Sequence, residues 1–561
     1  MNKNAFTLIE LLAVIIILAI VALIATPIIL DVVDDARKSA GLSESNMIYS
    51  SINNYCASIE MKKQMGTLGS EDVDCSSKTS FTTAEISKMV NLGKATVESN
   101  SYANGKLTNL VVISNKNRYV LCSNGSMALE SDGCEVNKPD LTYKDNSGAN
   151  SPELLDNMIP IKYDGSNWIY TTNEQINWYN YDKKEWANAV VLNDGVSKNV
   201  GDIITEDEIA LWYVWIPRYT YTIFNGNNES VVEQEIKIKF ESGTNSSGTV
   251  ECVDAVSGNG DSSETCTDDT NGSIVNGTST YTHPAFTFGT QELTGFWIGK
   301  FEVSGSTDEI LIKPNVSSLI ELNVSTYFTA IQNIGTTYKL NGDSHMMKNM
   351  EWGAVAYLSH SKYGTCTDGK CVEIGINNNS NYITGCGAKP GENESTNCNK
   401  YDTTTGMLAS TTQNIYGVYD MSGGAFEYVM AFVVDDNGLF NAGNSGFTKA
   451  PDSKYYNSYT SAKSYTIYER GKLGDATKET LKTFGNKFCI NESCNLYRDG
   501  WYANYTTFPI FSGTQINLLW MSRGCSHLDG WNNVAGLFAF GIAWGGQDAA
   551  VTTRAVLCKS E

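Results

Sequence analysis

The residues with the greatest capacity for chemistry are the 14 cysteines, because thiols can ligate metals, form disulfides or act as nucleophiles. No Cys-x-x-Cys pair or Cys/His cluster occurs, and the four histidines are scattered, so the spacing does not favour a zinc site. Disulfides in an oxidising compartment fit better, although connectivity cannot be derived from sequence and buried free thiols stay the alternative. The expected couples are Cys56/Cys75, Cys122/Cys134, Cys252/Cys266, Cys366/Cys371, Cys386/Cys398 and Cys489/Cys494, with Cys525 and Cys558 as the remaining disulfide candidates.

Other catalytic chemistry has no recognisable residue set in this sequence. There is no Ser/His/Asp grouping at a nucleophile turn, no histidine–carboxylate motif and no phosphate-binding glycine loop. We therefore expect a binding protein without a catalytic cofactor. Lys plus Arg total 40 against 62 Asp plus Glu, and the resulting charge of −22 repels phosphate backbones, which makes nucleic acid an unfavourable partner.

The N-terminus carries a long apolar run, residues 6–29, that contains one acidic residue, Glu10. As a helix the run would span about 36 Å, enough to cross a hydrocarbon core about 30 Å thick. Only Lys3 precedes it, which is fewer basic residues than a secretory signal peptide carries. A carboxylate inside a membrane helix costs several kcal/mol unless it is paired, so Glu10 implies a functional partner.

Residues 5–10, Ala-Phe-Thr-Leu-Ile-Glu, followed by the apolar run with Pro27, resemble the cleavage and methylation motif of type IV prepilins. The resemblance implies that a prepilin peptidase cuts between Ala5 and Phe6 and that the new Phe6 amine is methylated. Glu10 would pair with this amine on a neighbouring pilin subunit. The protein is then expected to cross the cell membrane once before assembly and to reach the cell surface or pilus, with its C-terminal domain outside the cell. Ala5 stands where the family prefers glycine, and an uncleaved signal anchor is the alternative.

We expect a mixed α+β fold in three parts after a leader peptide at residues 1–5. Residues 6–137 form the pilin part: a helix that continues to about Lys63, because apolar residues recur at helical spacing, and a small β head with a hairpin at 107–114 and 118–123. A Pro-, Asn-, Ser- and Gly-rich segment at 138–153 marks a boundary. Residues 138–201 are predicted to be a β-rich connector, whose many Trp and Tyr residues more often form a core than an exposed sugar-binding face.

Residues 202–561 are predicted to form the third part. The segment 414–428, Asn-Ile-Tyr-Gly-Val-Tyr-Asp-Met-Ser-Gly-Gly-Ala-Phe-Glu-Tyr, is similar to the signature of the formylglycine-generating-enzyme family of C-type-lectin-like folds. Expected strands at 212–219 and 295–303, a helix at 349–360 and the closing residues 554–557 follow the order of that family. The two copper-binding cysteines of its oxidase members are absent, since only Cys558 follows Arg554.

The same resemblance implies a structural calcium site. Carried over to this sequence, its ligands are Asp420, Gly423, Ala425 and Glu427, and carboxylate and carbonyl oxygens are the ligands that Ca²⁺ accepts. In the alternative interpretation Asp420 caps a turn and Glu427 belongs to an internal hydrogen-bond network.

Residues 520–557 resemble the C-terminal variable region of target proteins that retroelements diversify. Arg523-Gly524, Ala-Gly-Leu-Phe-Ala-Phe at 535–540 and Arg-Ala-Val-Leu at 554–557 match the scaffold of that pattern. An ordinary glycine-rich closing hairpin is the alternative. The resemblance implies a contact surface for an extracellular protein or glycan ligand, made of Ser526, His527, Asp529, Trp531, Asn532, Asn533, Ala543, Trp544, Gln547 and Asp548.

Together these features predict a minor or tip pilin that displays an adhesin domain. The prepilin peptidase, other pilin subunits and the cytoplasmic membrane are its expected partners. The alternatives are a membrane-anchored receptor that does not polymerise and an enzyme of the formylglycine-generating type.

Overall fold

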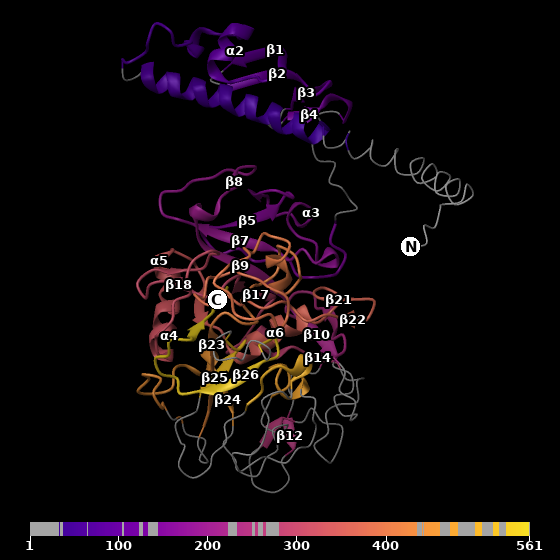
Figure 1. Ribbon diagram of the computed structural model, residues 1–561, viewed down its shortest axis with the longest axis vertical. Coiled ribbons are helices and arrows are strands. Elements are labelled where there is room, and N and C mark those ends of the chain that lie inside the picture. The colour runs from indigo at the N-terminus through magenta and orange to yellow at the C-terminus, as the bar shows by residue number, and fades with distance from the viewer. Residues whose placement is uncertain are drawn as a thin grey trace, which may run out of the picture. The chain divides into compact units, whose positions relative to one another are not determined.

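The protein is described here by a computed structural model. It describes residues 33, 37–63, 66–103, 106–122, 127–132, 144–222, 233–248, 253–255, 262–264, 280–434, 440, 442–459, 472–480, 500–507, 520–526 and 535–559. The chain divides into two compact units, residues 1–140 and 141–561 (Figure 1). Within the described residues, no helix combines the length and the apolar character needed to cross a membrane. The apolar run at 6–29 lies outside these residues, as do Ala5, Phe6 and Glu10.

In the first unit, a helix over residues 37–63 and a four-stranded antiparallel sheet share one core. Ile48 and Ile52, one helical turn apart, are fully buried together with Leu110 and Val112 of the sheet. The sheet order is β1-β2-β3-β4. The elements of this unit are η1 Cys75–Ser77, α2 Thr83–Met89, β1 Thr96–Ala103, β2 Lys106–Ser114, β3 Asn117–Leu121, β4 Met127–Leu129 and η2 Glu130–Asp132.

Three local features fix this small fold. Strands β2 and β3 are joined by Asn115 and Lys116, both at positive φ, the turn geometry that matches the twist of a hairpin. The Cys56–Cys75 disulfide fastens the helix to the segment before α2. The helix passes close to β3 at Gly41, where a Cβ would overlap the Tyr119 hydroxyl.

The second unit is built on an eight-stranded antiparallel sheet with the order β20-β28-β17-β9-β7-β5-β6-β8. Strand β9, at its centre, is buried along its whole length. The strands are β5 Met158–Tyr163, β6 Trp168–Tyr170, β7 Asn188–Leu192, β8 Ile203–Ile204, β9 Ile209–Pro217, β17 Gly295–Gly299, β20 Asp343–Met346 and β28 Ala555–Cys558.

This sheet corrects the predicted division of the chain. The expected boundary near residue 138 lies close to the one observed, but the predicted connector at 138–201 is not a separate part. Its strands β5, β6 and β7 belong to the large sheet, and β7 pairs directly with β9. The aromatic residues of this segment form a core, as expected, but it is the core of the whole second unit: Trp168, Trp178 and Trp186 are buried there.

A second sheet holds the C-terminal strands. Its order is β24-β23-β25-β26, and β27 pairs with β23 in parallel. Helix α6, buried over its entire length, lies beside β23. The elements are β23 Phe426–Val433, β24 Asn457–Tyr459, β25 Trp520–Arg523, β26 Phe540–Ala543, β27 Val551–Thr553, α4 Val324–Gln332, α5 Ile334–Thr337 and α6 Asn349–Ser359.

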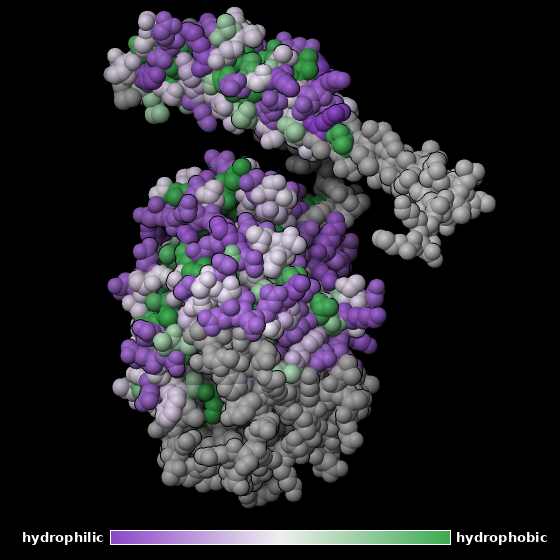
Figure 2. All heavy atoms as spheres, viewed as in Figure 1, coloured by the Kyte–Doolittle hydropathy of each residue, from purple (hydrophilic) through white to green (hydrophobic). Residues whose placement is uncertain are grey.

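Smaller elements complete the second unit. The short strands are β10 Tyr219–Thr222, β11 Lys237–Phe240, β12 Val253–Ala255, β13 Ser262–Glu264, β14 Tyr281–Thr282, β15 Thr287–Phe288, β16 Gln291–Glu292, β18 Ser304–Gly305, β19 Ile310–Leu311, β21 Cys366–Thr367 and β22 Lys370–Cys371. The short helices are α3 Gln175–Trp178, η4 Tyr181–Lys183, η5 Glu206–Glu208, η6 Pro284–Phe286, η7 Gly406–Ala409, η8 Ser453–Tyr455, η9 Lys478–Thr480 and η10 Trp501–Ala503. On the face visible in Figure 2, hydrophilic residues predominate, which fits the acidic composition.

Candidate functional site

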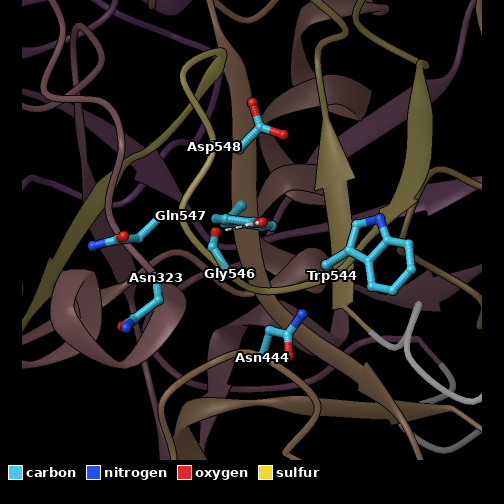
Figure 3. Close-up of a pocket in the computed structure, with 7 residues that line it drawn as sticks. Asn323, Asn444, Trp544, Gly546, Gln547 and Asp548 are labelled. Atoms are coloured by element: carbon cyan, nitrogen blue, oxygen red, sulfur yellow. Dashed lines mark hydrogen bonds between the residues drawn. The ribbon is translucent and has the colours of Figure 1, made fainter.

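A pocket of 440 Å³ lies where the loop between β26 and β27 meets the start of α4. In Figure 3, Trp544 and Gln547 lie on opposite sides of Gly546, with Asn323 and Asn444 below it and Asp548 above it. We call this cavity the Trp544 pocket. Its lining residues are Asn323, Tyr428, Asn444, Trp544, Gly546, Gln547 and Asp548.

Trp544 differs from the other described tryptophans by its exposure. Its side chain is 47% exposed, although an indole gains more from burial than almost any other side chain. An exposed tryptophan at the edge of a pocket is available for a ligand. The other described tryptophans are all at most 4% exposed: Trp168, Trp178, Trp186, Trp212, Trp215, Trp297, Trp352, Trp501 and Trp520.

Hydrogen bonds from three directions hold the loop that carries Trp544. The Tyr428 hydroxyl of β23 donates to the Gly546 carbonyl at 3.0 Å. The Val324 amide, in the first turn of α4, donates to the Gly545 carbonyl at 3.0 Å, and the Asn444 amide donates to the Trp544 carbonyl at 3.3 Å. Burial, together with the nearby Asp548 carboxylate, raises the pKa of Tyr428, so its hydroxyl stays protonated and remains a donor at neutral pH.

The floor beneath the loop is aromatic. Trp520 of β25 is fully buried, stacks on Phe447 with ring centroids 5.7 Å apart, and contacts Phe432 of β23. Gly545 lies directly on this indole at a φ of +72°, where a Cβ would come within 2.4 Å of the Trp520 ring. Only glycine therefore fits between Trp544 and Gly546 without moving the floor or the loop.

The structure brings together three residues of the predicted contact surface. Trp544, Gln547 and Asp548 line one pocket, and Ala543 beside them is half-buried and packed against the core. Ser526 corrects the prediction: its side chain is fully buried after the end of β25, so it does not belong to an accessible surface. The remaining predicted contacts, His527, Asp529, Trp531, Asn532 and Asn533, lie outside the described residues.

Sequence reasoning missed Asn323, Tyr428 and Asn444, which reach the pocket from distant parts of the chain. Asn323 had a local signal, because it is the N-cap of α4 and its side chain accepts a hydrogen bond from the Thr326 amide. An Asn placed just before an apolar, helix-periodic run is a typical N-cap. No signal in the sequence indicates that this helix start faces residues 544–548.

Two of the predicted calcium ligands, Asp420 and Glu427, accept hydrogen bonds from nitrogen donors. Both oxygens of Glu427 accept hydrogen bonds from the Arg554 guanidinium, at 2.5 and 2.9 Å. Both oxygens of Asp420 accept from the Gly385 amide, and one also accepts from the Asn377 side chain. The Ala425 amide donates to Glu302. Hydrogen-bond donors thus contact the carboxylate oxygens of both Asp420 and Glu427, which is the internal network of the alternative interpretation.

These carboxylates share one buried cation. Burial, followed by the charges of Asp420 and Glu427, raises the pKa of Glu302 well above its ordinary value. Arg554 is the buried cation beside these groups, and it forms an ion pair with Glu427. Arg554, just before β28, also donates to the carbonyls of Gly299, at the end of β17, and Tyr419, in the segment before β23.

Six of the predicted disulfide cysteines are joined as expected in the structure: Cys56–Cys75, Cys366–Cys371 and Cys386–Cys398. Cys122 is disulfide-bonded. Its predicted partner Cys134, together with Cys252, Cys266, Cys489 and Cys494, lies outside the described residues.

Cys558 corrects the prediction of a disulfide. It is a free, buried thiol in β28, the strand between β20 and β17, and it is not joined to Cys525, which follows β25 in the other sheet.

The Cys558 thiol lies near two groups that could make it a nucleophile or a metal ligand. One ligand atom each of Cys558, His345 and Asp343 lies within 4.8 Å of the others. The His345 ring nitrogens are both engaged, Nδ1 with Asp343 and Nε2 with Glu351, each at 3.0 Å. Burial raises the pKa of Cys558, and the thiol is 1% exposed. This cluster therefore offers neither a free base nor access for a substrate.

The N-terminus of the chain matches a known protein family. A family model described as the prokaryotic N-terminal methylation motif matches residues 1–26. The chain has a type IV pilin-like N-terminus. This pilin-like segment implies processing by a prepilin peptidase and assembly with pilin subunits, and it indicates a membrane-anchored protein of the cell surface or pilus. No curated protein sequence matches the pilin-like chain.

Proposed function

We propose that the protein is a minor or tip subunit of a type IV pilus and that residues 141–561 are its extracellular adhesin domain. The methylation motif at residues 1–26 supports the pilin part of the proposal. The size of the second unit supports the tip placement, because a domain much larger than the pilin head would crowd a helical filament of identical copies. Glu10 pairs with the processed Phe6 amine of a neighbouring subunit.

The observation that carries the adhesin part is the exposed Trp544 in a pocket whose loop is held by hydrogen bonds from β23 and α4. A rigid exposed indole beside adaptable amides is typical of binding surfaces. The pocket lining offers amides, a tyrosine that donates to Gly546 and one carboxylate, with no nucleophile beside a base. We therefore propose binding and not catalysis.

The variable-region resemblance at 520–557 supports a finer proposal. The second unit is a C-type-lectin-like domain of the formylglycine-generating type, and its loop around Trp544, with the predicted contacts at 527–533, is the diversified face. A near-identical template repeat beside the gene, differing at adenines, tests this proposal. Without such a repeat, the pocket is an ordinary fixed binding site.

Immunogold labelling of cells with antibodies against residues 141–561 tests the proposed function. We expect label at filament tips in the wild type and on the cell membrane in Glu10→Ala, which cannot pair with its neighbour. Label along filament shafts would contradict the tip placement. Label on the membrane in both proteins would favour the receptor that does not polymerise. In a separate activity assay, copper-dependent oxidation of a substrate cysteine would favour the enzyme.

A further inference from the structure

We propose that the Trp544 pocket binds an uncharged saccharide without calcium. This inference rests on the proposed adhesin function and adds the chemical class of the ligand. A sugar ring presents one face of C–H groups and an edge of hydroxyls, so its site needs an exposed aromatic face together with both hydrogen-bond donors and acceptors. The pocket supplies these groups at 440 Å³, within the range of small-ligand sites.

The aromatic face comes from Trp544. The protein buries its other described tryptophans but leaves this one 47% exposed on a loop that three hydrogen bonds hold in place. Covering the indole with the C–H face of a sugar removes apolar area from water on both partners. Because the loop is already ordered, binding has little backbone entropy to overcome.

The polar groups around Gly546 can both donate and accept. The Asn323 Oδ1 accepts from the Thr326 amide at 2.9 Å, the Thr326 hydroxyl at 2.8 Å and the Ser325 hydroxyl at 3.0 Å, which fixes the side chain and leaves its Nδ2 as a donor. One oxygen of Asp548 accepts from the Ala550 amide at 2.9 Å, which leaves the other as an acceptor. The exposed side-chain amides of Asn444 and Gln547 can each donate and accept hydrogen bonds. This mixture of donors and acceptors matches sugar hydroxyl groups, each of which can also donate and accept.

The charges of the pocket argue against an anionic ligand. The residues that line it include no lysine, arginine or histidine, and they include the Asp548 carboxylate. A sialylated, sulfated or phosphorylated ligand would find no counter-charge there, in a protein whose formal charge is −22. A single exposed carboxylate also gives little affinity for a cation.

The surroundings also favour a saccharide over a protein ligand. A stable protein interface buries about 800 Å² on each partner around a central apolar cluster. Among the described residues of this unit, the other exposed large apolar side chains are Val200, Ile203 and Val372, and none of them lines the pocket. Of the apolar side chains that the structure describes in this unit, Trp544 alone offers the pocket an exposed stacking face, which suits a ring-sized ligand.

A glycan array probed with the detergent-solubilised full-length chain tests the proposal. We expect binding to glycans that end in neutral sugars, unchanged by EDTA. Trp544→Ala should weaken it about tenfold or more through lost stacking, whereas Trp544→Phe should keep part of it. Val200→Ala, which removes an exposed apolar side chain outside the pocket, is the matched control and should bind as the wild type does. Equal thermal unfolding of all variants excludes a loss of fold as the cause.

Each other outcome overturns the saccharide assignment. These outcomes are binding only to anionic glycans, binding abolished by EDTA, neutral-glycan binding that Trp544→Ala leaves unchanged, and no glycan binding at all. Capture of a protein ligand that depends on Trp544 would overturn the assignment while leaving the proposed adhesin function intact. The immunogold result, which depends on Glu10, is independent of all of them.

Discussion

Glu427 of β23 and Arg554, the residue before β28, form a fully buried ion pair with two hydrogen bonds, at 2.5 and 2.9 Å. The pair connects the C-terminal sheet to the large sheet, because Arg554 also donates to the Gly299 carbonyl at the end of β17. The two residues lie 127 positions apart in the sequence.

Glu427→Gln should lower the free energy of unfolding by about 3–5 kcal/mol, because it leaves the buried Arg554 guanidinium without its counter-charge. Urea unfolding followed by tryptophan fluorescence measures the change. Lys559→Gln is the control: it removes a pair with Glu153 at 3.9 Å whose lysine is 63% exposed, and should change stability by less than about 1 kcal/mol. Similar losses in both variants would contradict a structural role for the buried pair.

Calcium should not stabilise the protein through Asp420 and Glu427. Their oxygens accept hydrogen bonds from nitrogen donors, which a cation would have to displace. We therefore expect the same thermal unfolding midpoint in millimolar Ca²⁺ and in EDTA. A rise of several degrees with Ca²⁺ that disappears in Asp420→Asn would show that these residues do bind the ion.

His345 should make stability depend on pH above neutrality. Burial lowers its pKa, but the carboxylates of Glu351 and Asp343 outweigh that effect and raise the pKa above its ordinary 6.5. The folded state therefore holds this proton more tightly than the unfolded state. The stabilisation is complete below pH 6.5 and is lost as the pH rises through the folded pKa.

Two lysines and Asp343 lie beside the His345 and Glu351 pair, and Asp343 affects stability only in acid. Lys348 pairs with Glu351 at 3.4 Å, and Lys454 pairs with Asp343 at 3.2 Å. Burial raises the pKa of Asp343, but the hydrogen bond and charge of His345 outweigh burial and lower the pKa to about 2. Its contribution is present above pH 3.8 and is lost only as the pH falls towards 2.

Unfolding midpoints measured from about pH 7 to 9 check the His345 prediction, because below pH 7 the buried His283 and His360, with pKa values lowered to about 3, make stability rise with pH instead. The wild type should lose stability across this range, and His345→Gln should lose much less. His360→Gln is the matched control, because burial lowers the pKa of His360 to about 3 and the ring is neutral throughout the range. If wild type and His345→Gln gave parallel curves, the histidine would not be the titrating group.

Gly545→Ala should damage both stability and binding. The new Cβ would meet the Trp520 ring at 2.4 Å, at a φ of +72° that disfavours side chains. The expected cost is about 1–3 kcal/mol, with loss of binding at Trp544. Gly546→Ala is the neighbouring control, since its nearest contact would be the Asn444 Cβ at 3.2 Å, and it should cost less. Equal effects of the two substitutions would show that the aromatic floor does not set the loop.

Local periodicity was enough to predict the helix and one hairpin of the first unit, but not strands β1 and β4. Ile48, Ile52 and Ile59 recur at helical spacing and are buried, and the alternation on either side of Asn115 and Lys116 gives the hairpin of β2 and β3. The helix at 349–360 and the strand around 209–217 were also found from apolar patterns. These signals depend on residues close in sequence.

Long-range pairings were not predictable from one sequence. Nothing local indicates that β7 pairs with β9, so residues 138–201 read as a separate part. The Trp544 pocket likewise joins Asn323, Tyr428 and Asn444 to residues 544–548 through contacts that no spacing rule encodes. Trp544, Gln547 and Asp548 were predicted because residues 520–557 resemble the variable region of retroelement-diversified proteins.

Mass spectrometry of the N-terminus of protein recovered from cells tests the central claim, that the chain is processed and assembled as a pilin. We expect the mature chain to begin at Phe6 with a methylated amine, as the motif at residues 1–26 implies. A mature chain that still begins at Met1 would contradict the account.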